Sequence, residues 1–127
     1  MNARADGIQR PQRSQQDVSD WAAIEAQIDG IVQRSGGAFA LETVAQVRDF
    51  LQLIRGRCRV PRVSKGYWNT ISFAWDETVG GPIEVEVFKD RLEVYRFFNQ
   101  RTDIRHTVHA PGEPFPQEFV NELPLLP

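Results

Sequence analysis

The chain of 127 residues has the composition of an ordinary globular protein, with 41% hydrophobic and 25% charged residues and a net charge of −2 at pH 7. Its length fits one domain and is too short for two independent cores. The longest apolar run, Phe50–Ile54, is far below the roughly 20 residues that a membrane-spanning helix needs. These features exclude a membrane-spanning class and argue against a fibrous or wholly disordered chain.

The N-terminal segment predicts the compartment and the start of the folded part. It contains no apolar stretch of the kind that a secretory signal needs, and the lone Cys58 excludes an internal disulfide, so we expect a cytoplasmic protein. Residues 1–16 are rich in Arg, Gln, Asn and Ser, and so few apolar groups cannot offset the entropy cost of ordering. We therefore predict a disordered tail over residues 1–16 and a single α+β domain over residues 17–127.

The choice of basic residue indicates the source. Arginine supplies every basic residue except Lys65 and Lys89. This preference is typical of GC-rich genomes and favours a bacterial or phage origin.

Two helices are predicted in the first half of the chain. Trp21, Ile24 and Ile28 recur at helical spacing, and the run Ser35-Gly36-Gly37 ends that pattern. The second helix, Leu41–Arg55, is followed by Gly56 and carries an apolar stripe that consists of Val44, Val47, Leu51 and Ile54. Because the connection between the helices is short, we expect an antiparallel helical hairpin.

After Pro61 the apolar period changes from 3.6 residues to 2, which indicates β-strands. The predicted strands are Ile71–Trp75, Ile83–Val87, Leu92–Phe98 and Ile104–His109. Short turns join them, so we expect a four-stranded antiparallel meander whose inner face is covered by the helices. The expected core residues on that face are Ile71, Phe73, Trp75, Ile83, Val85, Val87, Leu92 and Val94.

The C-terminal segment completes the predicted fold. A proline-rich break at residues 111–114 ends the sheet, and Pro116 begins a short helix that runs through Leu123. Such a helix is too short to persist alone, so it must dock on this protein or on another. The predicted fold class is therefore α+β, with an N-terminal helical hairpin packed on a four-stranded antiparallel meander and a short C-terminal helix.

Few residues point to covalent chemistry or metal binding. Arg57 and Arg59 flank Cys58 and would lower the pKa of its thiol, and His106 or His109 would be the base, yet no nucleophile motif surrounds these residues. On a strand, His106 and His109 point to opposite faces, so they cannot easily share one metal ion. We therefore expect no catalytic cysteine and no histidine metal pair.

The carboxylates and the phosphate-binding motifs lead to the same expectation. Glu84 and Glu86 share one face and are interpreted as the solvated side of a half-buried strand. The sequence contains no Gly-rich phosphate loop, no GxSxG motif and no HExxH motif. We expect a protein without enzymatic activity, cofactor or metal.

A basic run followed by aromatic residues gives one functional hypothesis. Five basic residues without an intervening acid precede two aromatic ones, a mixture that can bind phosphates and stack on bases. A helix C-terminus would equally favour the first two arginines, and the chain as a whole is slightly acidic. Nucleic-acid binding by residues 55–68 is the alternative hypothesis. Its candidate residues are Arg55, Arg57, Arg59, Arg62, Lys65, Tyr67 and Trp68.

Surplus apolar side chains in the second half give the other hypothesis, a protein partner. If Leu92 and Val94 face inward, then Tyr95 and Phe97 face outward and stay exposed unless the C-terminal helix covers them. The partner would be another protein or a second copy of the chain, without membrane binding. The predicted interface residues are Tyr95, Phe97, Phe98, Phe115, Phe119 and Leu123.

A sequence pattern in the middle third supports a non-enzymatic role. Trp68–Trp75, followed by Gly81–Val87 and Asp90–Tyr95, resembles a hairpin pattern of small uncharacterised bacterial α+β proteins that are often encoded near toxin–antitoxin or mobile-element genes. The resemblance carries over no catalytic residue and implies an accessory role. The favoured function is a protein-interaction module that acts as an adaptor, chaperone or inhibitor.

Overall fold

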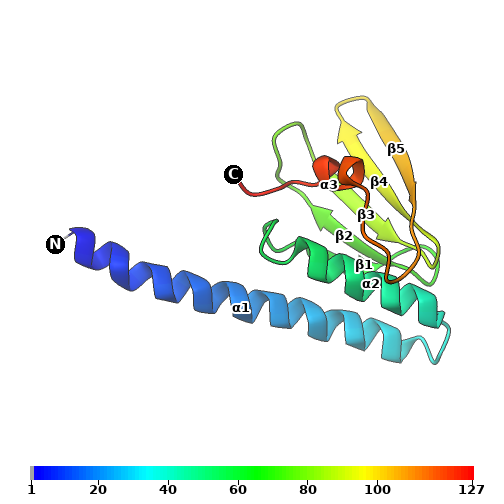
Figure 1. Cartoon of the computed structure of the whole chain (residues 1–127), viewed down its shortest axis with the longest axis horizontal. Coiled ribbons are helices and arrows are strands. Elements are labelled where there is room, and N and C mark those ends of the chain that lie inside the picture. Colours follow the sequence, from blue (N-terminus) through cyan, green and yellow to red (C-terminus); the bar gives the residue numbers. More distant parts are fainter. Residues whose placement is uncertain (1) are drawn as a thin grey trace.

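The structure is a computed structural model that describes the backbone of residues 2–127 and the side chains of residues 18–127. Two helices precede a sheet of five antiparallel strands, and a short helix follows it (Figure 1). No helix of the described chain is long and apolar enough to cross a membrane. The elements are α1 (Asn2–Arg34), α2 (Leu41–Ile54), β1 (Arg62–Lys65), β2 (Ile71–Trp75), β3 (Ile83–Val87), β4 (Arg91–Phe98), β5 (Arg101–Val108) and α3 (Gln117–Glu122).

The first two helices form the predicted antiparallel hairpin (Figure 1). Ion pairs join them, with Arg55 Nη1 2.8 Å from Glu25 Oε1 and Arg48 Nη2 3.6 Å from Asp29 Oδ1. Helix α1 extends back to Asn2, over the segment 1–16 where a disordered tail is predicted from the sequence. The side chains of residues 1–17 lie outside the described residues, and the disorder stays a prediction.

The sheet has five strands in the order β1-β2-β3-β4-β5, so the prediction of four strands is wrong by one. The additional strand, β1, lies in the segment that was interpreted as a basic loop, and it pairs with β2 from Arg62↔Ala74 to Lys65↔Ile71. The sequence of β1 lacks the apolar alternation of a half-buried strand, because Val63 is its one buried apolar residue. Pairing with β2 and packing against α1, which are both non-local, define this strand.

The core lies between the helices and one face of the sheet, which we call the inner face. The Phe50 ring of α2 meets Phe73 of β2 edge to face at a centroid distance of 4.9 Å. Trp21 and Ile24 of α1 belong to the same buried cluster. All eight core residues expected on the inner face are buried, which confirms the predicted strand alternation.

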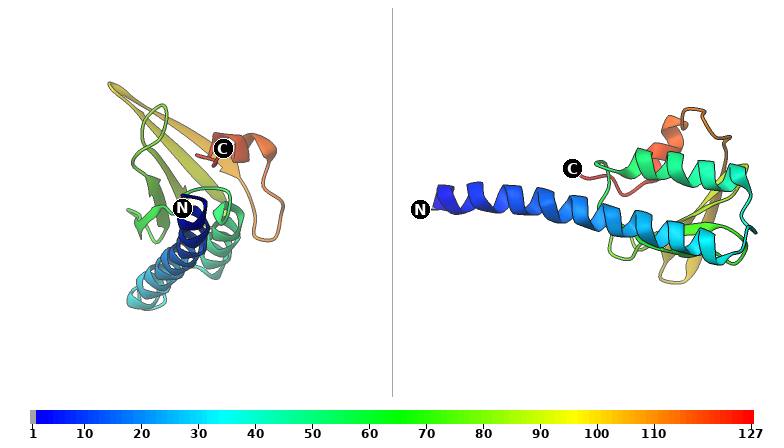
Figure 2. Two further views of the ribbon diagram at one scale, coloured as in Figure 1. Left: turned by 90° about the vertical axis from the view of Figure 1, so that its left-hand side faces the viewer. Right: turned by 90° about the horizontal axis from the view of Figure 1, so that it is seen from below.

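The C-terminal segment docks on the inner face as well. Phe119 of α3 is buried, with its ring 6.0 Å from Phe50. Leu126 N donates a hydrogen bond to Arg57 O at 2.7 Å, and a β-bridge joins Cys58 to Leu125. The three helices therefore lie on one side of the sheet (Figure 2), and no helix covers the opposite side, the outer face.

Candidate functional site on the outer face of the sheet

Two rows of side chains on the outer face cross all five strands. One row is polar, and the other mixes charged and apolar groups. The register of the four strand pairs gives the first row as Ser64, Ser72, Glu86, Glu93 and His106, and the second as Arg62, Ala74, Glu84, Tyr95 and Ile104.

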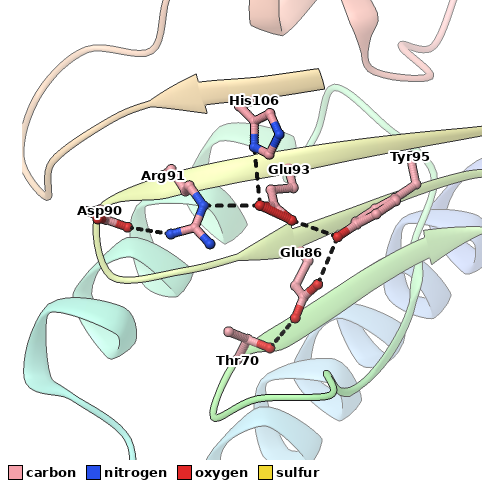
Figure 3. Close-up of polar contacts among 7 residues, drawn as sticks. All are labelled: Thr70, Glu86, Asp90, Arg91, Glu93, Tyr95 and His106. Atoms are coloured by element: carbon pink, nitrogen blue, oxygen red, sulfur yellow. Dashed lines mark hydrogen bonds and ion pairs between the residues drawn. The ribbon is translucent and has the colours of Figure 1, made fainter. Parts of the chain in front are cut away.

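Two carboxylates meet in the middle of this face. Glu86 and Glu93 lie directly opposite each other on β3 and β4. The Tyr95 hydroxyl lies 2.7 Å from Glu93 Oε1 and 3.2 Å from Glu86 Oε1 (Figure 3). A phenol has one proton, so it donates to one carboxylate at a time, and the shorter distance favours Glu93. Like charges directly opposite each other destabilise a sheet, and this shared hydroxyl reduces that cost.

A guanidinium, an imidazole and a hydroxyl group around the pair complete the network. Arg91 Nε lies 3.0 Å and His106 Nδ1 lies 3.2 Å from Glu93 Oε2. Thr70 donates its hydroxyl proton to Glu86 Oε2. Figure 3 shows that these groups approach the two carboxylates from several sides. Every charge of the cluster therefore has a partner.

The network shifts three pKa values, and it raises that of Arg91 through the hydrogen bond to Glu93. Burial of Glu93 opposes its ionisation, but the hydrogen bond from Tyr95 and the Arg91 guanidinium outweigh that effect and lower the pKa of the carboxyl group. Burial raises the pKa of Tyr95 well above its ordinary value, and Glu93 and Glu86 raise it further. The cluster therefore holds an ionised carboxylate beside a neutral phenol.

This cluster stabilises the sheet and is poorly suited to catalysis. Glu86 and Glu93 are each only 8% exposed, so little of either carboxylate is open to a substrate. The interpretation of Glu86 as a solvated side chain is therefore wrong, because the Tyr95 phenol and the Thr70 hydroxyl cover it. Among residues 18–127, no group of three His, Cys, Asp or Glu side chains is placed to hold a metal ion.

The aromatic residues of β4 gather at one end of the sheet. Phe97 is half-buried on the outer face, and Phe98 is 38% exposed. Both line an open groove of about 1070 Å³ between the β2–β3 turn and the β4–β5 turn. Gly81 forms one wall, and a Cβ there would lie 2.5 Å from Phe97 O, so only glycine allows this close approach.

The remaining predicted interface residues lie on the other side of the sheet. Phe119 and Leu123 are buried in the core, and Phe115 stacks on His109 with ring centroids 4.0 Å apart. The C-terminal helix docks within its own chain and leaves Tyr95 and Phe97 uncovered. The structure thus divides the predicted interface: Tyr95 and Phe97 face outward, Phe98 lies at the exposed end of β4 on the inner side of the strand, and Phe115, Phe119 and Leu123 pack inward.

The candidate histidines do not meet. His106 lies on the outer face beside Glu93, whereas His109 is buried beneath the C-terminal segment. Gln46 of α2 contacts His109 twice: its Nε2 donates to His109 O at 2.5 Å, and its Oε1 lies 2.5 Å from His109 Nδ1. His109 therefore connects α2 to the start of the C-terminal segment.

Cys58 is buried, and burial raises the pKa of its thiol to about 11, although the nearby Arg57 charge opposes the rise. The expectation of a lowered thiol pKa is wrong, because desolvation outweighs the effect of the flanking arginines. A thiol of this kind is a weak nucleophile at neutral pH.

The basic run does not form one surface. Arg55 pairs with Glu25 across the helical hairpin, and Arg62 and Lys65 point to opposite faces of the short strand β1. Arg62 forms two hydrogen bonds with Asp76, at 3.0 and 3.2 Å, which raise the pKa of the guanidinium and lower that of the carboxyl group.

Arg59 and Lys65 of the run also have partners within the chain, and Arg57 contributes a backbone contact, because its carbonyl oxygen accepts from Leu126 N. Arg59 Nη2 donates to Glu77 O at 2.6 Å, and Lys65 Nζ donates to Trp68 O at 2.8 Å. Tyr67 and Trp68 stand at the exposed β1–β2 turn, 87% and 64% exposed, and their rings meet edge to face. Within residues 18–127, the basic side chains of the run and its two aromatic rings are therefore spread over different surfaces.

Sequence reasoning missed the Glu86–Glu93–Tyr95 cluster. A hairpin centred between Lys89 and Asp90 places Glu86 opposite Glu93, so the facing pair of carboxylates could have been predicted from the sequence. The burial of both carboxylates and their shared contact with the Tyr95 hydroxyl could not be predicted from the sequence.

Comparisons of the chain with family models, with curated proteins and with solved structures found no match.

Proposed function

We propose that the protein is a non-enzymatic protein-interaction module, an adaptor, chaperone or inhibitor, that binds its partner with the β4–β5 end of the outer face. The proposed surface consists of Tyr95, Phe97 and Ile104 together with the groove beside Phe98. We call it the aromatic end.

One observation carries this proposal: all three helices pack on the inner face and leave the aromatic end uncovered. Ile104 is 52% exposed and stands directly opposite the half-buried Tyr95. Aromatic side chains beside an aliphatic one, bordered by charged residues, are typical of the centre of a protein interface. The groove between the two turns gives such a partner a concave site.

The middle of the outer face supports binding more than catalysis. Tyr95 is held by the Glu86 and Glu93 carboxylates, so its ring position is fixed before a partner arrives. A preformed aromatic surface loses little side-chain entropy on binding, which favours affinity. The exposed edge of this ring is part of the aromatic end.

The test compares two substitutions on the same face. Phe97→Asp places a charge in the aromatic end, whereas Val108→Asp places the same charge at the other end of β5, where Val108 is 85% exposed. Tagged wild-type protein and both variants would be purified from the native host, and the retained proteins identified by mass spectrometry. We expect wild type and Val108→Asp to retain the same protein and Phe97→Asp to lose it.

Two results would contradict the proposal. Retention of the same protein by Phe97→Asp would place the binding surface elsewhere. Loss of all bound material after nuclease treatment, together with co-purifying DNA or RNA, would instead favour the basic residues and the exposed Tyr67 and Trp68.

A further inference from the structure

Strand β5 (Arg101–Val108) is a long, open edge of the sheet. It pairs with β4 on one side, and within residues 2–127 no strand pairs with its other side. Figure 1 shows β5 at the boundary of the sheet, whereas at the opposite boundary α1 packs against β1. Of the two edges, therefore, only β5 offers eight consecutive residues for pairing with another strand.

The register identifies the backbone groups that this edge presents. His109 N, one residue beyond β5, donates to Asp90 O at 3.2 Å. By the alternation of an antiparallel strand, the backbone N–H and C=O groups of the odd-numbered β5 residues therefore point toward β4. Backbone groups alternate in direction along an antiparallel strand. The N–H and C=O groups that point away from β4 are therefore those of Thr102, Ile104, His106 and Val108.

From this edge we infer that a second copy of the chain pairs with β5 in antiparallel orientation, with Ile104 facing Ile104 of the other copy on a two-fold axis. This inference goes beyond the proposed function, because it concerns the backbone edge of β5 and names its partner. The two five-stranded sheets become one continuous sheet, with all helices on one side and both aromatic ends on the other.

Charge complementarity selects both the partner and the register. Arg101, Asp103 and Arg105 alternate in sign along the inner side of the edge. Arg105 Nη1 lies 3.0 Å from Glu122 Oε1 and Arg101 Nε lies 3.9 Å from Asp103 Oδ1, and the Asp103 and Arg105 side chains are still 45% and 68% exposed. With Ile104 on the axis, each Asp103 faces the Arg105 of the other copy, which gives two opposite-charge pairs. This alternation makes the strand complementary to itself.

The neighbouring registers are less favourable. A shift by one residue places outward backbone groups opposite inward ones, so no ladder forms. A shift by two residues in one direction places Asp103 opposite Asp103 of the other copy, and the same shift in the other direction places Arg105 opposite Arg105. Like charges directly opposite each other destabilise a sheet. Among these closely related registers, only the one centred on Ile104 forms the ladder and pairs opposite charges.

The expected dimer is weak, since a single pair of strands forms a small interface. Interfaces of this size are typical of transient complexes, so we expect a dissociation constant on the order of micromolar. Charged edge strands also serve in other proteins to prevent pairing, and that role is the competing outcome of the test.

The test is a charge exchange measured by sedimentation velocity over a wide range of protein concentration. We expect wild type to dimerise, and Asp103→Arg alone and Arg105→Asp alone to weaken dimerisation by about tenfold or more. The double exchange restores both pairs, and so does an equimolar mixture of the two single variants. Because the mixture contains the same chains that fail alone, its recovery shows that misfolding did not cause the loss.

Cross-linking checks the register independently. In a Cys58→Ser background, Ile104→Cys places two thiols opposite each other at a Cα distance of about 5.5 Å, which suits a disulfide. Val108→Cys is the matched control, because in this register Val108 faces residue 100 of the other copy. We expect a disulfide-linked dimer from Ile104→Cys and none from Val108→Cys.

Three results would overturn the inference: a monomer at all concentrations, a dimer that the single charge changes leave intact, or no recovery in the mixture. A monomer that still binds another protein through Phe97 would overturn the inference and leave the proposed function standing.

Discussion

Glu86 and Glu93 face each other across two strands and share one phenol proton from Tyr95. This relationship explains why two carboxylates can be buried on an uncovered sheet face. It also fixes the ring of an aromatic residue beside the proposed binding surface, so the stability of the sheet and the proposed function depend on the same hydroxyl.

Tyr95→Phe should destabilise the protein. The change keeps the ring and removes the hydroxyl shared by the carboxylates, so Glu93 keeps Arg91 and Glu86 keeps Thr70, but each buried carboxylate has one partner fewer. We expect the free energy of unfolding to fall by about 1–2 kcal/mol at pH 7, measured by urea denaturation. Glu86→Gln is the control that removes the repulsion at its source, and in that background the cost of Tyr95→Phe should shrink. An unchanged cost in both backgrounds would contradict the shared role of the hydroxyl.

Acid should destabilise the protein through Glu93. The pKa of Glu93 is lower in the folded chain than in the unfolded chain, so its contribution to stability is complete above the ordinary value near 4.3. This contribution is lost as the pH falls below that value and through the folded pKa. Urea denaturation between pH 3 and pH 6 should therefore show a flatter pH dependence for Glu93→Gln than for wild type. Identical slopes would argue against a lowered pKa.

The Cys58 thiol should be unreactive while the protein is folded. Burial raises its pKa to about 11, whereas an unfolded cysteine titrates near 8.5. The thiol therefore contributes stability below about pH 8.5, and the contribution falls as the pH rises toward 11. A thiol reagent at pH 8 should label the native protein far more slowly than the urea-unfolded protein. Equal rates would show that Cys58 is accessible in the folded chain.

Phe119 and Phe97 should respond differently to the same substitution. Phe119 is 2% exposed among core aromatics, so Phe119→Asp should cost at least the roughly 3–5 kcal/mol expected for truncating a buried phenylalanine. Phe97→Asp on the outer face should lower the melting temperature much less. Circular dichroism during heating measures both. A strongly destabilised Phe97→Asp protein would make that variant unsuitable for the binding test.

His109 should be important for docking of the C-terminal segment. His109 Nδ1 lies 2.5 Å from Gln46 Oε1, its Nε2 lies 2.7 Å from Glu113 O, and its ring stacks on Phe115. His109→Ala keeps the backbone acceptor of Gln46 Nε2 but leaves the buried Gln46 Oε1 without its partner, and it should cost about 2–3 kcal/mol in urea denaturation. Limited proteolysis should then cleave near residue 113 faster than in wild type. Unchanged stability and cleavage would show that the segment is held by other contacts.

The sequence predicted the features that depend on local periodicity. The apolar alternation at Ile71–Trp75 and Ile83–Val87 located two central strands and their inward side chains, and the spacing of Val47 and Ile54 located the buried face of α2. Each pattern covers at least one full strand or several helical turns, so the burial of one face controls it directly.

Local sequence patterns could not predict the features that depend on non-local packing. Strand β1 contains one buried apolar residue and is defined by its pairing with β2. The C-terminal helix has six residues, and the face on which it docks depends on the position of Phe50. Burial raises the pKa of Cys58 and outweighs the opposite effect of the Arg57 charge. The sequence shows the neighbouring arginine but not the burial.

Site-specific photocrosslinking tests the central claim most directly. A photoreactive phenylalanine would replace Phe97 in one protein and Val108 in another, and both would be irradiated in the native host. The account predicts a specific cross-link from position 97 to a protein other than a second copy of this chain, and none of that kind from position 108. The same other protein cross-linked from both positions, or from position 108 alone, would contradict the assignment of the aromatic end as the binding surface.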